Sequence, residues 1–208
     1  LGWSHGDQEI FSIDEMCQLF DLENVNKSAS SINPEKLLWL NQEYIKNLDP
    51  SIIAPHLEYI MTQQGINTAQ GPALESIITA LSERSKTLVE LAQSSRYFYH
   101  DFDTFDNKAA SKNLKQTAIV PLEHLLTEFK KIDHWDGKQL HQIVLDATDK
   151  LDLKLGMIAQ PLRVAITGSG ASPSIDVTLE LIGKQRVLQR IQKAIDYINL
   201  GLHSRTNS

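Results

Sequence analysis

The chain has 208 residues, 41% of them hydrophobic, and a formal net charge of −6. This size and composition can bury a sizeable core, as one large domain or two small ones. No apolar run approaches the roughly 18 to 20 residues that span a bilayer, and no basic and apolar leader opens the sequence, so neither a membrane partner nor secretion is expected. The single cysteine, Cys17, excludes an internal disulfide and fits the reducing cytoplasm, where we expect the protein to work.

The charge is unevenly distributed along the chain. Residues 1–60 hold three basic and ten acidic side chains, a net charge of −7, whereas residues 161–208 hold six basic and three acidic ones, a net charge of +3. Phosphate contacts come mainly from Lys and Arg, so RNA contacts are expected in the basic C-terminal segment. The first residue is Leu1 rather than Met, from which we expect the chain to be a fragment of a longer polypeptide.

The first part of the chain contains three helix starts with recognisable caps. Ser12 and Glu15 form a capping box ahead of a short helix. Asn33–Pro34 and Asp49–Pro50 each combine a capping side chain with a proline at the first helical position. Apolar residues keep helical spacing behind both starts, and Gly65 is expected to end the second of these helices.

The helical pattern continues through the rest of the chain. Pro72 is expected to open the longest helical region, which runs through residue 92. Apolar spacing predicts further helices over residues 114–129, with a kink at Pro121, and over 136–151 and 187–198. No alternating apolar and polar run is bounded as a strand would be. The sequence therefore predicts an all-α helical bundle or cage with no substantial sheet.

Residues 160–184 carry the densest turn signals. Pro161 is expected to open a short helix that Gly168 closes in a left-handed conformation. Ser172–Pro173 are expected to supply the cap and the first residue of the next helix. Two short helices joined by this Gly, Ser and Pro-rich elbow would bring free backbone amides close to Arg163, a geometry that can hold an anionic or polar group.

The elbow holds four short motifs: Pro161-Leu162-Arg163, Thr167-Gly168, Ser172-Pro173 and Leu181-Ile182-Gly183-Lys184. They resemble the C-terminal anticodon-binding segment of bacterial glutamyl-tRNA synthetases, which are class I aminoacyl-tRNA synthetases. Residues 1–45 resemble the part of those enzymes that follows the catalytic domain, and residues 84–98 resemble the middle of the anticodon-binding part. The resemblance runs in order over the whole chain except its tail.

The resemblance implies a division of labour along the chain. Residues 1–70 would contact the tRNA stem, residues 71–155 and 156–200 would form a first and a second helical anticodon-binding subdomain, and residues 201–208 would be a flexible tail. The partner would be tRNA-Glu, and the parent protein a monomeric glutamate-tRNA ligase.

Arg84 matches the position that reads the third anticodon base in the family. A guanidinium can donate to the two neighbouring acceptors on the pairing edge of cytosine, whereas guanine presents donors there. Arg84 would therefore separate glutamate from glutamine anticodons. From the residues alone, the favoured interpretation is an arginine on a helix surface that pairs with Glu83 or Glu90, and only the resemblance favours base reading.

The resemblance carries three further groups of residues. The other anticodon contacts would be Arg163, Ser172, Pro173 and Ile175, with Pro173 and Ile175 packing an unstacked base. The weaker stem contacts would be Lys36, Trp39, Asn41 and Tyr44. The basic residues expected to steer the tRNA backbone are Lys184, Arg186 and Arg190.

No catalytic residue and no metal ligand is expected in this chain. The two ATP-binding signatures of class I synthetases, H-x-G-H and K-M-S-K-S, are absent from it, so ATP and magnesium would belong to an upstream catalytic domain, and this fragment alone should not aminoacylate. The seven histidines show no metal-ligand spacing. Two alternatives remain. One is a helical scaffold that binds a protein partner through the acidic first third of the chain. The other is a hydrolase or metal enzyme, which only the scattered histidines support.

Overall fold

The computed structural model describes residues 2–26 and 31–206, which form eleven α-helices and three short 3-10 helices. The α-helices are α1 (Ile13–Leu19), α2 (Pro34–Asn47), α3 (Pro50–Gln63), α4 (Leu74–Leu81), α5 (Leu88–Tyr99), α6 (Asn107–Asn113), α7 (Ile119–Lys131), α8 (Gly137–Leu151), α9 (Leu155–Thr167), α10 (Ile175–Ile182) and α11 (Lys184–Thr206). The 3-10 helices are η1 (Leu22–Asn24), η2 (Ser82–Arg84) and η3 (Gln116–Ala118). In the described ranges the β pairing is limited to one isolated bridge, so the predicted all-α fold is confirmed.

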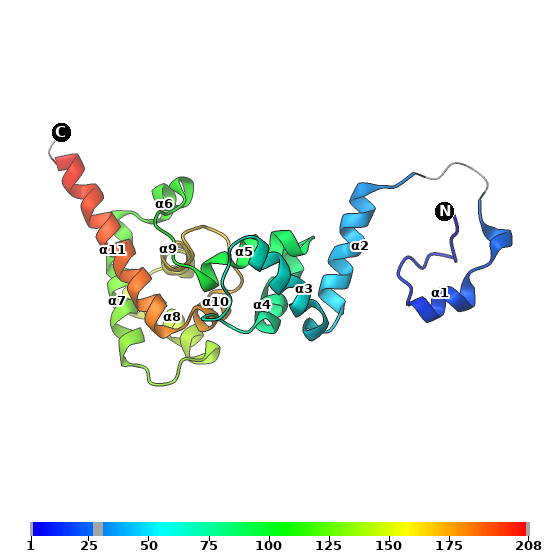
Figure 1. Ribbon diagram of the computed structural model, residues 1–208. Coiled ribbons are helices and arrows are strands. Elements are labelled where there is room, and N and C mark those ends of the chain that lie inside the picture. The colour runs from blue at the N-terminus through cyan, green and yellow to red at the C-terminus, as the bar shows by residue number, and fades with distance from the viewer. Residues whose placement is uncertain (1, 27–30, 207–208) are drawn as a thin grey trace.

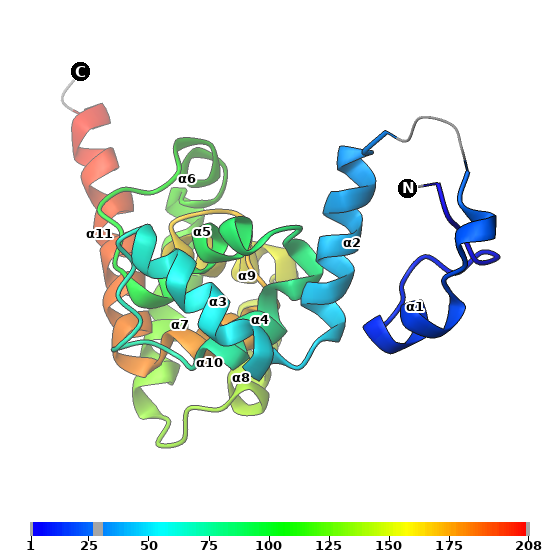
Figure 2. The same cartoon turned by 45° about the vertical axis from the view of Figure 1, so that its right-hand side comes forward.

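The helices form an elongated body with the two ends of the chain far apart. Figure 1 shows α1 and α2 at one end and α11 at the other. After a 45° turn, Figure 2 still shows α1 set apart from the main bundle, with α2 next to it. None of the helices in the two described ranges is long and apolar enough to cross a membrane.

The main bundle consists of two groups of helices that share one core. In the first group α3, α4 and α5 pack on one another around fully buried side chains such as Leu57, Ile77 and Leu91. In the second group α7, α8, α9, α10 and α11 pack around residues such as Phe129 and Leu162. Helix α10 also packs against α4 and α5 and so joins the two groups. This junction brings the α9–α10 loop next to α5.

The three capped helix starts predicted in the first part of the chain are confirmed. Ser12 Oγ accepts a hydrogen bond from the Glu15 amide at 3.1 Å, and the Glu15 carboxylate accepts one from the Ser12 amide at 2.7 Å, which completes the capping box. The Asn33 side chain caps α2 by accepting from two amides of its first turn, and the Asp49 side chain caps α3 by accepting from the Ser51 amide at 2.8 Å. Local sequence was sufficient here because a cap bonds only to its own first turn.

The predicted long helix after Pro72 is wrong. Helix α4 begins at Leu74, passes into η2 and ends, and α5 starts afresh at Leu88. Thr87 causes the restart, because its side chain accepts from the Glu90 amide at 3.1 Å and caps α5. The longest described helix is instead α11, with 23 residues.

Two expectations about prolines and the tail are also corrected. Pro121 is the third residue of α7, where the missing amide would have no helical partner, so it does not sit inside a kinked helix. Helix α11 continues to Thr206, so the predicted tail over 201–208 is helical across most of its length. A helix already nucleated by a buried stripe gains a hydrogen bond with each added residue. Residues 207–208 lie outside the described residues.

The N-terminal end is much less buried than the bundle. Helix α1 buries none of its residues, and α2 buries only Ile45. The apolar stripe expected on α2 is largely exposed: Leu37, for example, keeps 59% of its surface. Helical spacing was read correctly there, but spacing does not say whether a partner covers the face.

The helix packing does not break at the predicted segment borders. Helix α3, which precedes the border at 70/71, packs on α4 and α5, and α8, which precedes the border at 155/156, packs on α9 and α10. Both borders thus fall inside a packed group of helices. The assignment of separate roles to these segments stays a prediction.

Candidate nucleic-acid interface

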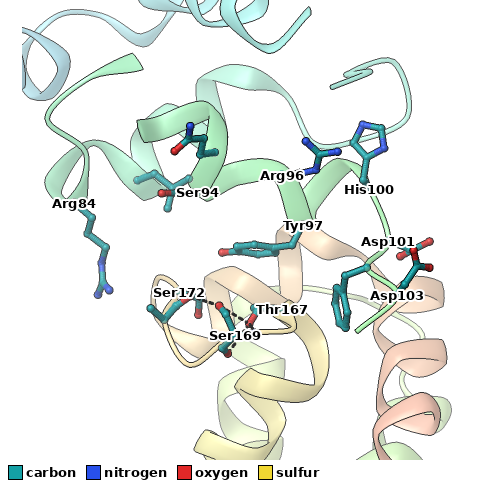
Figure 3. A pocket seen from close by; sticks show the side chains of 14 residues that line it. Arg84, Ser94, Arg96, Tyr97, His100, Asp101, Asp103, Thr167, Ser169 and Ser172 are labelled. Carbon is teal, nitrogen blue, oxygen red and sulfur yellow. Dashed lines mark hydrogen bonds between the residues drawn. The ribbon is translucent and has the colours of Figure 1, made fainter. Parts of the chain in front are cut away.

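A pocket of about 770 Å³ lies at the junction of the two groups of helices. One wall comes from η2 and α5, the other from the α9–α10 loop, and the α5–α6 loop closes one side (Figure 3). The pocket is lined by Leu81, Arg84, Gln93, Ser94, Arg96, Tyr97, His100, Asp101, Phe102, Asp103, Thr167, Ser169, Ala171 and Ser172. Arg84 and the elbow residues that line the pocket, which follow it by 83 or more positions, therefore face one cavity.

The turn of the α9–α10 loop depends on Gly168. Its φ of +76° is left-handed, as predicted, and a Cβ at this position would lie 3.0 Å from the ring of Phe102. The Gly168 carbonyl accepts a hydrogen bond from the Asp106 amide at 2.8 Å. A glycine is therefore needed both for the backbone conformation and for the close approach of the α5–α6 loop.

The two helices that flank the loop differ from the prediction. Pro161 is the seventh residue of α9 and is buried, so it does not open a helix. Helix α10 begins at Ile175, two residues later than expected, and Ser174 rather than Ser172 precedes it. The Ser172 hydroxyl bonds to Arg163, Thr178 and the Pro173 carbonyl instead of capping α10, and residues 172–174 are not helical.

Arg163 holds the loop from within. Its Nη1 donates to the carbonyl of Ser172 at 3.0 Å, to that of Pro173 at 2.6 Å and to the Ser172 hydroxyl. In the described part of the chain its Nε and Nη2 have no hydrogen-bond partner. Burial lowers the pKa of Arg163, and the positive charge of Arg84 lowers it further. The two guanidinium groups are thus close enough to share one electrostatic field.

The remaining elbow residues of the predicted set are packed into the protein. Ser172 is 6% exposed, and its hydroxyl accepts from Thr178 Oγ1 at 3.1 Å and donates to the Pro173 carbonyl at 3.0 Å. Pro173 and Ile175 are both buried. They do not offer the stacking surface that was expected, because the elbow folds back on the core. Ser172 lines the pocket, but its hydroxyl already has partners.

Arg84 is exposed at the end of η2 and points toward the pocket (Figure 3). Glu83 and Glu90, the two carboxylates considered as its partners, bond to other groups. Glu83 lies 3.2 Å from the ammonium of Lys46, and Glu90 accepts from the Lys86 amide at 2.7 Å. Within the described ranges Arg84 forms no hydrogen bond and no ion pair. Its donors are therefore free for a ligand.

The three basic residues expected to steer the tRNA backbone are bound to the protein itself. Arg190 is only 4% exposed, pairs with Asp101 at 2.8 Å, and donates to three backbone carbonyls. Arg186 donates to the Phe98 carbonyl at 2.6 Å, and Lys184 to two carbonyls that end α7. Arg190 is therefore a structural residue, and its prediction as a surface charge is wrong. A pair of basic residues one turn apart gave no local sign of this burial.

Two pocket residues carry features that the sequence reasoning did not single out. Arg96 is exposed on α5, and no ion pair is found for it among the described residues. Tyr97 lies beside it with its hydroxyl buried and without a hydrogen-bond partner in the described chain. Gln93, Arg96 and Tyr97 stand three and four residues apart, so they share one helical face. That spacing indicates a shared helix face, but the sequence does not show which segment lies opposite that face.

The predicted stem contacts lie on α2, which packs against η2 but does not line the pocket. Lys36 pairs with Glu9 at 2.7 Å, and Asn41 donates to the Lys86 carbonyl at 2.6 Å. Trp39 is 37% exposed and Tyr44 40% exposed. Asn41 thus ties α2 to the segment that carries Arg84, whereas the two aromatic side chains remain available to a partner.

Residues 2–26 and 31–206 contain no cluster of three or more His, Cys, Asp or Glu side chains placed to hold a metal ion. The pocket is instead lined by the exposed guanidinium groups of Arg84 and Arg96 and by the carboxylates of Asp101 and Asp103. Such a pocket suits a ligand with hydrogen-bond acceptors and a partial negative charge on the arginine side.

An all-α bundle with free guanidinium groups around a surface pocket is one form of nucleic-acid-binding domain. Residues 43–195 match the model of the anticodon binding domain family, and the chain belongs to that family.

Two solved structures are similar over almost the whole chain. One is a glutamate tRNA ligase from Elizabethkingia meningosepticum in complex with its amino acid, with 28% identity, a TM-score of 0.86, and coverage of 95% of this chain and 39% of that one. The other is a glutamate-tRNA synthetase from Elizabethkingia anophelis, with 28% identity, a TM-score of 0.82, and coverage of 94% of this chain and 38% of that one. The resemblance to the anticodon-binding part of bacterial glutamyl-tRNA synthetases is thereby confirmed. This chain spans about two fifths of the length of either structure.

Proposed function

We propose that this chain recognises the anticodon of tRNA-Glu through the pocket between Arg84 and the α9–α10 loop. The observation that carries the proposal is the placement of Arg84, an exposed guanidinium without a partner in the described chain, opposite a loop held in a fixed shape by Arg163. An unpaired base of an anticodon loop can enter such a pocket and be read on its pairing edge.

The two arginines have different roles in this proposal. Arg84 contacts the third anticodon base, because its fork of donors fits the acceptors of cytosine and is repelled by the donors of guanine. Arg163 shapes the loop through Nη1 and keeps Nε and Nη2 for the bound RNA. Pro173 and Ile175 support the loop from the core. The tRNA stem contacts α2 through Lys36, Trp39 and Tyr44.

The proposal extends to the parent protein. The chain would be the tRNA-binding part of a cytoplasmic, monomeric glutamate-tRNA ligase, and it would not aminoacylate by itself. ATP and magnesium would bind to a catalytic domain that this sequence does not contain. The similarity to two longer synthetase structures supports this arrangement.

Binding to tRNA-Glu and tRNA-Gln over a range of salt concentrations tests the proposal. We expect tighter binding of tRNA-Glu at every ionic strength. Counterion release contributes equally to the binding of both RNAs, whereas the base contacts differ between them. Equal affinity for both RNAs, or for an unrelated tRNA, would refute it. Capture of a protein partner that RNase treatment leaves unchanged would favour the scaffold alternative.

Arg84→Ala sharpens this test. It should reduce discrimination at the third anticodon base by roughly 1 to 3 kcal/mol, the typical contribution of a bidentate base contact. Lys138→Ala is the matched control, since Lys138 is exposed on α8 and does not line the pocket. It removes the same charge and should leave discrimination intact. If Arg84→Ala weakened the binding of every tRNA equally, Arg84 would be a general charge contact and not a base contact.

A further inference from the structure

Tyr97 combines two properties that a purely structural tyrosine does not have. Its ring lines the pocket, and its hydroxyl is buried without a hydrogen-bond partner in the described part of the chain. A buried hydroxyl usually has a partner, because an unsatisfied one costs about 1 to 3 kcal/mol. Tyr99, two residues further along the same helix, follows the usual rule and donates to the Pro72 carbonyl at 2.9 Å.

The surroundings of the Tyr97 hydroxyl favour an acceptor as its missing partner. In Figure 3 the ring projects from α5 over the loop, with its hydroxyl end toward the side where Arg84 and Ser172 lie. Burial raises the pKa of the Tyr97 phenol, while the positive charges of Arg163 and Arg84 oppose that rise. The group therefore stays protonated near neutral pH and is a donor, and the nearby guanidinium charges attract electron-rich atoms.

We propose that the Tyr97 hydroxyl is a specificity-determining donor, which completes its hydrogen bonding only when an RNA nucleotide presents an acceptor oxygen between Arg84 and the α9–α10 loop. The inference rests on the proposed function and adds a residue to it. The hydroxyl has no partner in the described chain to give up, so the bond formed on binding replaces no hydrogen bond to these residues. A nucleotide without an acceptor at that point would leave the hydroxyl unsatisfied and would bind less well.

Tyr97→Phe tests the inference because it removes one oxygen and keeps the ring. Binding of an anticodon stem-loop hairpin of tRNA-Glu should weaken about 5- to 10-fold, in the range of a single net hydrogen bond. The melting temperature of the free protein should stay the same or rise, since the variant no longer buries an unsatisfied hydroxyl.

Tyr99→Phe is the matched control on the same helix. It breaks a hydrogen bond to Pro72 outside the pocket, so the melting temperature should fall by about 2 to 4 °C while hairpin affinity stays unchanged. The two tyrosines should thus show opposite patterns. A fall in stability for Tyr97→Phe without a loss of affinity would overturn the inference.

The acceptor can belong to a base or to a phosphate, and modified hairpins distinguish the two. An abasic third anticodon nucleotide removes the base acceptors, and methylphosphonate linkages on either side of it remove phosphate charge. The effect of Tyr97→Phe should disappear on the one hairpin that lacks the contacted group, as in a double-mutant cycle. An effect of the same size on every hairpin would show that Tyr97 makes no direct contact.

Failure of this inference is distinguishable from failure of the proposed function. If the unsubstituted protein does not prefer the tRNA-Glu hairpin, the proposed function is refuted and the role of Tyr97 with it. If it shows that preference and Tyr97→Phe binds equally well, only the role of Tyr97 is refuted.

Discussion

The two walls of the pocket contain the same kind of residue in opposite circumstances. On the η2–α5 wall, Arg84 and Arg96 are exposed and form no ion pair in the described chain. Behind the other wall, Arg163 and Arg190 donate to backbone carbonyls and hold segments together. The comparison shows that the arginines of the first wall keep their donors unused at the surface, whereas those behind the second wall use donors to hold the fold together. Residue type alone does not separate these roles.

Arg190→Ala should give the largest loss of stability. The substitution leaves the buried carbonyls of Ile166, Tyr97 and His100 without their donor and removes the ion pair with Asp101. We expect the free energy of unfolding to fall by about 3 kcal/mol, and thermal unfolding should show a melting temperature roughly 6 to 12 °C lower. A loss below about 1 kcal/mol would mean that the buried arginine is not needed for folding.

Arg163→Ala should have the next largest effect. The carbonyls of Ser172 and Pro173 lose their common donor, so the free energy of unfolding should fall by about 2 kcal/mol in denaturant titrations. Hairpin affinity should fall as well, because the loop loses its fixed shape. If Arg163→Ala lowered hairpin affinity but left the free energy of unfolding unchanged, Arg163 would act only on the ligand and not on the fold.

Gly168→Ala should cost about 1 to 2 kcal/mol, from the left-handed φ and the close Phe102 ring. Gly170→Ala is the control within the same loop, since its added Cβ would lie 3.7 Å from the nearest side-chain atom, an ordinary contact. Chemical denaturation of both variants should therefore separate them. Equal stability would show that the turn adapts to a side chain at position 168.

Arg84→Ala should have the smallest effect on stability, within about 0.5 kcal/mol, because the exposed side chain has no partner in the described chain. Its effect should appear only in RNA binding, opposite to that of Arg190→Ala. A destabilisation above 1 kcal/mol would contradict the distinction between the two walls.

The prediction of helices succeeded where the signal was local. The side chains of Ser12, Asn33 and Asp49 bond to amides one turn away, so the sequence of five or six residues contained the whole interaction. The restart of α5 at Thr87 was equally local and could have been found, since Glu90 follows it at the spacing of a capping box. The exposure of the apolar stripe on α2 could not have been predicted locally, because exposure depends on distant parts of the chain.

The predicted proximity of Arg84 and the elbow is confirmed, whereas the role of these residues in RNA recognition stays a prediction. The sequence placed Arg84 and the elbow in one recognition site, and the structure shows both at one pocket. The sequence-based prediction also included Pro173, Ile175 and Arg190 as ligand contacts, although all three are buried. The burial of Arg190, for example, brings it to the carbonyls of Tyr97 and His100, 90 or more residues earlier, a relation that no local pattern expresses.

The sequence by itself determined the all-α class, the starts of the capped helices and the resemblance to an anticodon-binding segment, because each depends on residues within a turn or on a motif read in order. Only the tertiary structure decided which arginines have free donors and that the Tyr97 hydroxyl lacks a partner. Hydrogen-bond satisfaction and burial are properties of neighbours brought together by folding, and those neighbours lie up to 93 residues apart here.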